Sequence, residues 1–233
     1  MARTTHEQGR PAGTRWTRFG RRAVATFVAV AVALMASALT RRAGNAEPRH
    51  QSSTLLRILG EPSTSQAIPP GYVTNDKVLC WFDVTILDND LPREYVATEL
   101  AYSDTPPYRD KGMLRARTRT PPGPWETFTV CFDFTIGTHS IFSPAAGKWV
   151  SAELNYPGIR KYMLRARADT VGPWERFGID GDLSNGVTIY SYGANMYASA
   201  ELAYDQPYRG MLRARSNVGR AWERFFLNKV IGP

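Results

Sequence analysis

Glutamate and arginine side chains recur together along this 233-residue chain, and two carboxylates in one site could act as the acid and the base of a glycosidase. A catalytic pair needs different environments for its two acids, so that one stays protonated while the other is ionised. Here acids and bases repeat in equal numbers, which favours a symmetric structural set of ion pairs and no enzyme activity. The residues are Glu99, Glu126, Glu153, Glu175, Glu201, Glu223, Arg115, Arg117, Arg165, Arg167, Arg213 and Arg215.

Other patterns for catalysis or metal binding are weak. The histidines are His6, His50 and His139, and no serine lies in a Gly-x-Ser-x-Gly turn. His139 occupies a position where two related segments carry valine, which indicates a strand residue. Residues 180–186, DGDLSNG, have the carboxylate spacing of a calcium loop but lack its closing glutamate, so they are interpreted as a polar turn. We predict no catalytic residue, no metal site and no cofactor.

Tyrosine and arginine side chains in three turn-rich segments are the candidate ligand-binding residues. Such segments are typical of hairpin tips that face solvent. Aromatic rings beside guanidinium groups suit sugar hydroxyls, carboxylates or a protein surface, and three weak sites would add by avidity on a polymer. The alternative is that the tyrosines pack against the fold and hold their own loops. The residues are Tyr102, Tyr108, Arg109, Tyr156, Arg160, Tyr204, Tyr208 and Arg209.

Three tryptophans occupy one repeated position, directly before a glutamate and close to a phenylalanine. They are Trp125, Trp174 and Trp222, spaced 49 and 48 residues apart. An exposed indole stacks well on a sugar ring, because it has a broad apolar face and one N–H donor. Their shared position favours packing in the core or in a cap, and this is the role we predict.

The elements that position these residues form three related copies. Each copy joins Glu-Leu-x-Tyr to Met-Leu-Arg-Ala-Arg and then to Trp-Glu-x-Phe. Short β-branched and aromatic runs separated by turn residues predict four strands per copy. Three such units predict an all-β protein, a β-trefoil of three four-strand repeats of roughly 50 residues each. The domain would span residues 78–233, with repeats at about 78–131, 132–180 and 181–233.

This repeat resembles that of the fascin-like (actin-crosslinking) β-trefoil family. The residues that carry the resemblance are WVSAE at 149–153, LRAR at 164–167 and GPWERF at 172–177, and related versions stand in the other two copies. The Gln-x-Trp motif of ricin-type lectin trefoils does not occur. The resemblance implies either actin-like filament binding or, as in similar bacterial domains, a non-catalytic accessory role beside polysaccharide-degrading enzymes.

The positive charge of the chain is concentrated at its beginning. Residues 1–46 carry eight arginines and one glutamate, whereas residues 47–233 carry 21 basic and 20 acidic residues, which excludes a nucleic-acid partner on charge. The basic head, an apolar run at 23–39 and small residues after it predict a signal peptide for Sec or twin-arginine export. An uncleaved membrane anchor is the alternative. Residues 47–77 are interpreted as a flexible linker.

Two cysteines, Cys80 and Cys131, suit an oxidising compartment, where a disulfide between them could close a loop of about 50 residues. Two buried, unpaired thiols are the alternative.

The combined prediction is a secreted, monomeric, non-catalytic module that binds an extracellular polysaccharide or glycan through its Tyr/Pro/Arg loops. The alternative is a protein-interaction module, which would bind actin-like filaments or inhibit an extracellular enzyme. Inhibition would use the longest loop, SDTPPYRDKG at residues 103–112.

Overall fold

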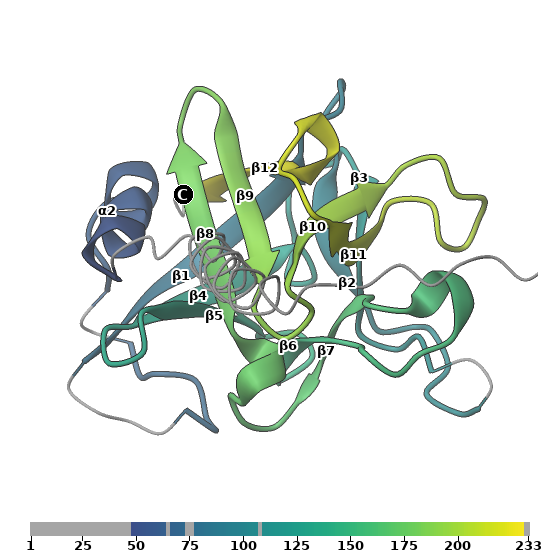
Figure 1. Cartoon of the computed structure of the whole chain (residues 1–233), viewed down its shortest axis with the longest axis horizontal. Helices are drawn as coiled ribbons and strands as arrows, with labels where there is room; N and C mark the ends of the chain where they lie inside the picture. Colours follow the sequence, from purple (N-terminus) through teal and green to yellow (C-terminus); the bar gives the residue numbers. More distant parts are fainter. Residues whose placement is uncertain (1–47, 64–65, 73–76, 107–108, 231–233) are drawn as a thin grey trace, which may run out of the picture. The chain divides into compact units, whose positions relative to one another are not determined.

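The computed structural model describes residues 48–63, 66–72, 77–106 and 109–230 (Figure 1). The predicted signal in residues 1–46 lies outside this part of the chain. Within it, no helix combines the length and the apolar character that crossing a membrane would need.

The strands are β1 (Val78–Asp88), β2 (Tyr95–Glu99), β3 (Met113–Thr118), β4 (Thr127–Asp133), β5 (Thr138–Ser143), β6 (Lys148–Ala152), β7 (Leu164–Ala168), β8 (Phe177–Asp182), β9 (Gly186–Ser191), β10 (Met196–Glu201), β11 (Met211–Ser216) and β12 (Arg224–Lys229). One helix, α2 (Pro48–Leu59), precedes them, and three short 3-10 helices, η1 (Gly158–Arg160), η2 (Pro173–Glu175) and η3 (Ala221–Glu223), lie between strands.

The all-β expectation is confirmed, but the predicted β-trefoil of three four-strand repeats is wrong. All twelve strands belong to one antiparallel sheet, and its pairings close on themselves because β9 pairs with β10 and β12, while β3 pairs with β2, β7 and β11. Strands of different sequence copies pair with each other: β1 with β12, β4 with β5, and β8 with β9. Four short strands alone would leave unpaired edges. The pairings between copies satisfy those edges, so the sheet of twelve strands closes into one antiparallel barrel.

The three copies interlock where β3, β7 and β11 meet. The N–H of Ala116 donates to the carbonyl of Gly210, that of Ala166 to Gly112, and that of Ala214 to Tyr162, at 2.8 to 2.9 Å. At Gly112 φ is +88°, and a Cβ there would come within 2.3 Å of the Ala166 carbonyl oxygen. Glycine is therefore required for this close backbone approach.

Buried side chains fill the interior from every part of the sheet. Along β4 the side chains alternate: Phe128, Val130 and Phe132 join the main core, whereas Cys131 joins a second cluster on the other face. Alternation of this kind follows from the two-residue period of a strand. The largest fully buried side chains include Trp81, Trp149, Phe177 and Phe225.

Helix α2 lies within the segment that the sequence suggested to be a linker, and there the structure differs from the prediction. Leu55 and Leu59, one turn apart on the same face, are 0% and 5% exposed and belong to the main core. The helix packs against β8 and β12. It ends at Leu59 and is followed by Gly60, where φ is +72° and where the carbonyl accepts a 2.7 Å hydrogen bond from the Trp81 indole. These long-range contacts, and not helical propensity, place the helix.

The structure joins Cys80 and Cys131 in a disulfide. The two residues lie directly opposite each other on β1 and β4. Their sulfurs pack in the second cluster with Val78, Phe142 and Trp149. The bond therefore links two adjacent strands of the first copy across a sequence separation of 51 residues.

Reduction of this disulfide is expected to lower the free energy of unfolding by about 4 kcal/mol, because the unfolded chain regains the entropy of a loop of this length. Urea unfolding at fixed pH, with and without reductant, measures the difference. The double variant Cys80→Ser, Cys131→Ser should match the reduced protein and should not respond to reductant. Identical unfolding midpoints for the oxidised and reduced protein would contradict the prediction.

Candidate functional site

The predicted Tyr/Arg loops connect β2 to β3, β6 to β7 and β10 to β11, and their tyrosines point toward a shared apolar cluster. The cluster consists of Met113, Met163 and Met211, the first residue of each Met-Leu-Arg-Ala-Arg motif, and all three are fully buried. Four of the predicted binding residues pack on it and are half-buried: Tyr102, Tyr156, Tyr204 and Tyr208. Tyr108 lies outside the described residues. The placed tyrosines therefore have a packing role, which was the alternative interpretation.

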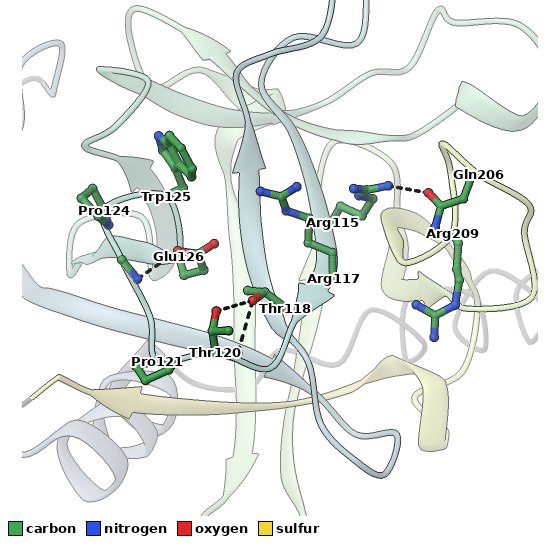
Figure 2. Close-up of a pocket in the computed structure, with 11 residues that line it drawn as sticks. Arg115, Arg117, Thr118, Thr120, Pro121, Pro124, Trp125, Glu126, Gln206 and Arg209 are labelled. Carbon is green, nitrogen blue, oxygen red and sulfur yellow. Dashed lines mark hydrogen bonds between the residues drawn. The ribbon is translucent and has the colours of Figure 1, made fainter.

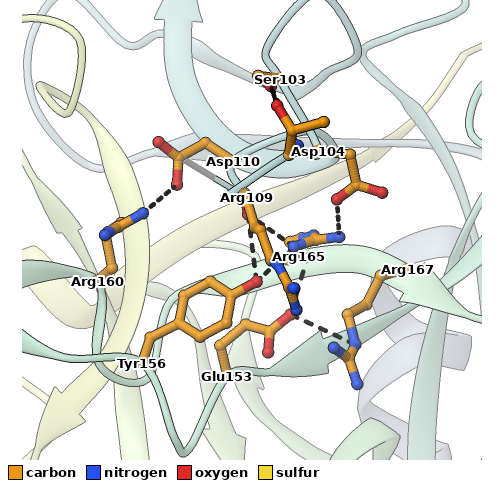
Figure 3. A network of polar contacts seen from close by, with 10 residues as sticks. Ser103, Asp104, Arg109, Asp110, Glu153, Tyr156, Arg160, Arg165 and Arg167 are labelled. Atoms are coloured by element: carbon orange, nitrogen blue, oxygen red, sulfur yellow. Dashed lines mark hydrogen bonds and ion pairs between the residues drawn. The ribbon is translucent and has the colours of Figure 1, made fainter. Parts of the chain in front are cut away.

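An arginine holds each loop from a neighbouring copy. Arg165, on β7, donates to the carbonyl of Arg109 at 2.6 Å and pairs with Asp104 at 2.7 Å, both in the loop of the first copy (Figure 3). The same guanidinium donates to the Tyr156 hydroxyl at 2.5 Å. That hydroxyl donates in turn to the Arg109 carbonyl at 3.3 Å. One side chain thus fixes two loops.

Equivalent arginines repeat this arrangement around the junction. Arg115 donates to the side-chain oxygen of Gln206 and to the carbonyl of Pro207, each at 2.9 Å. Arg213 donates to the carbonyl of Lys161 at 2.6 Å and to the Tyr204 hydroxyl at 2.8 Å. Each copy therefore stabilises the loop of another copy, and the loops form one interlocked layer.

The glutamate of each Glu-Leu-x-Tyr motif lies between two arginines of the strand that follows the motif. Glu153 lies 3.8 Å from Arg165 and 3.4 Å from Arg167, and Glu99 and Glu201 have the same two kinds of partner. Burial raises the pKa of Glu153, and the two arginines partly oppose this effect. The ion pairs expected from the sequence form for these three acids.

The other three acids act differently from the prediction. Glu126, Glu175 and Glu223 accept hydrogen bonds from the backbone N–H of Gly123, Gly172 and Arg220, three residues earlier, at 2.8 to 2.9 Å. Each carboxylate is thereby drawn inward, at 5–7% exposure, and closes the turn that carries a tryptophan. These acids are turn caps rather than members of the ion-pair set.

The remaining predicted arginines are also held by neighbours. Arg160 pairs with Asp110 at 3.5 Å, and Asp110 accepts a 2.9 Å hydrogen bond from the Tyr208 hydroxyl. Arg209 pairs with Glu94 at 3.0 Å. Arg109 is exposed, and its carbonyl is the atom that Arg165 binds.

The three repeated tryptophans are exposed, so the prediction that they pack in the core or a cap is wrong. Trp125, Trp174 and Trp222 are 52%, 43% and 58% exposed. The physical reason lies in the turn: the buried glutamate that follows each tryptophan caps the backbone from inside and leaves the preceding ring outside. Three broad aromatic faces with N–H donors therefore reach solvent, which is the property that suits a sugar ring.

One tryptophan borders a cavity of about 640 Å³ (Figure 2). The loop from Thr118 to Trp125 forms one side, and Gln206 and Arg209 of the third copy form the other. Arg115 and Arg117 lie between them on β3. The cavity thus combines an indole face, guanidinium groups and the hydroxyls of threonines, which can pack on a polar ligand and form hydrogen bonds with it.

Of the ligand-binding residues predicted from the sequence, Arg209 alone lines this cavity. Trp125 and Arg117 were assigned structural roles, and Thr118 and Gln206 were not singled out. A signal was available. In the first copy the tryptophan lies eight positions after Arg117, whereas in the other two copies it lies seven positions after the equivalent arginine. The turn of the first copy also contains three prolines. An insertion in one of three otherwise matched turns indicates a place where function can break the symmetry.

His139 has a structural role. It is fully buried on β5, and its Nδ1 accepts a hydrogen bond from the backbone N–H of Ile179 at 3.3 Å. Burial lowers the pKa of His139 to about 3, so the ring is neutral at physiological pH. The interpretation as a strand residue is confirmed.

The predicted polar turn at 180–186 connects β8 and β9. Asp182 accepts hydrogen bonds from the backbone N–H groups of Ser184 and Asn185 at 2.9 and 2.7 Å. This is the geometry of an aspartate that closes its own turn.

The fold and site together define an antiparallel β-barrel with exposed tryptophans, of which Trp125 borders a cavity. Neither a family model nor a curated protein sequence matches the chain. Among solved structures, a mosquitocidal holotoxin is similar with a TM-score of 0.50 and 9% identity, over 64% of this chain and 17% of the toxin chain. A designed 3-fold symmetric protein, ThreeFoil, is similar with a TM-score of 0.49 and 11% identity, over 64% of this chain and 99% of that chain. At such identity the likeness to the toxin concerns the fold alone.

Proposed function

We propose that this protein is a secreted, non-catalytic module that binds an extracellular polysaccharide or other glycan. The observation that carries the proposal is the 52% exposed indole of Trp125 at the edge of the cavity. A pyranose can stack on that indole while its hydroxyls contact the polar groups that line the cavity. Trp174 and Trp222 provide two further stacking faces, and weak contacts at several faces add on a polymer.

The guanidinium groups of the cavity suit a ligand with many oxygen atoms. Arg117 binds Glu99 through its Nε at 3.1 Å, and its side chain is 36% exposed. Arg209 binds Glu94 and is 37% exposed. Because each arginine is held by one carboxylate while part of it faces the cavity, both are positioned before a ligand arrives, which reduces the entropic cost of binding.

The proposal keeps the ligand class expected from the sequence and moves its binding residues from the tyrosine loops to the tryptophan turns. Membership in the fascin-like (actin-crosslinking) family and export by the signal at 1–46 are parts of the same proposal. The sequence resemblance quoted above supports the first, and the basic, apolar and small-residue order of the leader supports the second.

Trp125→Ala is expected to weaken binding to an insoluble polysaccharide by about tenfold, or about 1.4 kcal/mol, because it removes the stacking face. Trp174→Ala and Trp222→Ala should have smaller effects that add to it. A pull-down of the full chain on a panel of insoluble polysaccharides identifies the ligand, and binding isotherms then give the affinities.

Leu91→Ala is the matched control, because Leu91 is 80% exposed but does not line the cavity, so binding should not change. Co-sedimentation with actin filaments runs alongside. Retention on no polysaccharide would contradict the proposal, and pelleting with filaments would replace it with actin-like filament binding. Retention that survives all three tryptophan substitutions would leave the ligand class intact but reject the site.

A further inference from the structure

Three tyrosines of the β9–β10 hairpin form a second aromatic surface, which we call the tyrosine face: Tyr192 is exposed, and Tyr190 and Tyr197 are half-buried. Tyr190 and Tyr197 are opposite each other in the antiparallel register, with ring centroids 5.0 Å apart. The ring of Tyr192 lies 5.4 Å from that of Tyr190 and is 42% exposed. Tyrosines in such clusters are typical of interaction surfaces, because each combines a rigid apolar ring with a hydroxyl.

The corresponding face of the β5–β6 hairpin is covered by another part of the same chain. Phe142 and Trp149 are opposite each other in the same way, and their centroids are also 5.0 Å apart. Residues 66–72 lie against this pair. The Trp149 indole donates to the carbonyl of Pro70 at 2.9 Å, and the ring of Tyr72 meets it edge-on at 5.3 Å. As a result Trp149 is fully buried.

The covering segment reads QAIPPGY, the composition of an extended proline-rich peptide. Such a peptide has few N–H donors of its own and presents its carbonyls to a partner. Aromatic faces recognise it by packing on the pyrrolidine rings and by donating a hydrogen bond to a carbonyl. The indole bond to Pro70 is a contact of this type. The loop beside Trp149 adds a second anchor, because the N–H of Val171 donates to the carbonyl of Gly71 at 3.3 Å.

The tyrosine face has the same framework around it. Tyr197 lies opposite Ser216 on β11, just as Trp149 lies opposite Ala168 on β7. The loop after β11 also approaches the face, since a Cβ at Gly219 would lie 3.9 Å from Cε1 of Tyr197. Ring pair, adjacent strand and flanking loop therefore correspond in the two hairpins. At the tyrosine face, however, Tyr192 remains 42% exposed.

We propose that the tyrosine face binds an extended, proline-containing segment of a partner protein. Tyr197 takes the place of Trp149, and its hydroxyl takes the place of the indole donor. Tyr192 supplies a packing surface for a pyrrolidine ring. This inference does not depend on the glycan proposal, because it concerns a different hairpin from the Trp125 cavity and has its own probe.

The test uses a synthetic peptide with the sequence QAIPPGY and blocked ends, titrated into the full chain with calorimetry and with NMR of labelled tyrosine and tryptophan rings. Saturable binding is expected, with shifts at Tyr190, Tyr192 and Tyr197. Tyr192→Ser should weaken it by about fivefold, the cost of losing one interface anchor. Tyr197→Phe should weaken it while keeping the ring. The peptide QAIAAGY should not bind.

Leu183→Ser is the matched control, because Leu183 is 62% exposed on the neighbouring β8–β9 turn and should leave the affinity unchanged. Absence of saturable binding, or equal affinities for the parent protein and Tyr192→Ser, would overturn the proposal. Shifts confined to Trp149 would also overturn it, since the peptide would then only displace residues 66–72. A soluble oligosaccharide that binds in place of the peptide, and that Tyr192→Ser abolishes, would replace it with a sugar-binding surface.

Discussion

A chain that begins at residue 61 is expected to unfold at a much lower urea concentration than one that begins at residue 48, because it lacks helix α2. The helix contributes Leu55 and Leu59 to the main core, and Gly60, directly after it, provides the carbonyl that accepts the Trp81 indole hydrogen bond. Removal of two buried leucine side chains costs about 2–5 kcal/mol each, and the unpaired indole adds to the loss. Such a total is comparable to the whole stability of an ordinary domain.

Single substitutions separate the packing effect from the shortening of the chain. Leu55→Ala should lower the free energy of unfolding by about 2–5 kcal/mol. Arg57→Ala, in the same helix but exposed, should change it by less than about 0.5 kcal/mol. Equal unfolding midpoints for the chains beginning at residues 48 and 61 would show that the helix is dispensable, and would restore the interpretation of residues 47–77 as a linker.

His139→Val is expected to change how stability depends on pH. The pKa of His139 falls to about 3 in the folded protein because the ring is buried, whereas the ordinary value in an unfolded chain is near 6.5. Between these two values the unfolded chain binds a proton that the folded protein does not. Stability is therefore lost as the pH falls below about 6.5, by about 1.4 kcal/mol per pH unit, and by about 3 kcal/mol at pH 4.5.

A carboxyl group works in the opposite direction over part of this range. Burial raises the pKa of Asp88 to about 6, so its stabilising contribution is complete below its unfolded pKa and is lost as the pH rises through 6. Because both proteins retain Asp88, its effect cancels when they are compared. The difference in unfolding free energy between His139→Val and the parent should move in favour of the variant by about 3 kcal/mol between pH 7.5 and 4.5. A constant difference would show that His139 titrates normally.

Valine is the appropriate replacement because the other two copies carry Val84 and Val187 at this position, and both are buried. At neutral pH the substitution His139→Val lowers the free energy of unfolding, because valine cannot accept the hydrogen bond that His139 accepts from the N–H of Ile179. That cost does not depend on pH. Urea unfolding of both proteins at several pH values separates the two contributions.

Local patterns in the sequence were sufficient to predict the strands and several of the ion pairs. Each Leu-Arg-Ala-Arg run lies in a strand, and each preceding Glu lies beside both of its arginines, because residues two apart in a strand point to the same side. The threefold repeat also indicated correctly that Glu99, Glu153 and Glu201 form equivalent ion pairs with arginines, whereas the ion pairs predicted for the other three acids do not form. These features depend on neighbours within one hairpin, and one hairpin is contained in a short stretch of sequence.

The exposure of individual side chains was predicted wrongly from the sequence, because a side chain is buried or exposed according to which distant segments of the chain pack against it. Trp149 is buried by residues 66–72, whereas Trp125, in a repeated and well-patterned turn, is exposed. The tyrosines of the loops appeared suited to ligands, yet they pack on three methionines brought together from three copies. A contact between side chains from three copies cannot be predicted from any one local stretch of sequence.

The sequence by itself therefore determined the β character, the repeat and the side chains that alternate along each strand. The tertiary structure decided that strands of different copies pair into a closed barrel, that α2 belongs to the core, and that one tryptophan turn borders a cavity. The physical reason is the range of the forces involved. Backbone alternation and turn chemistry act between adjacent residues, whereas burial and edge pairing are settled only when segments distant in the chain compete for the same surface.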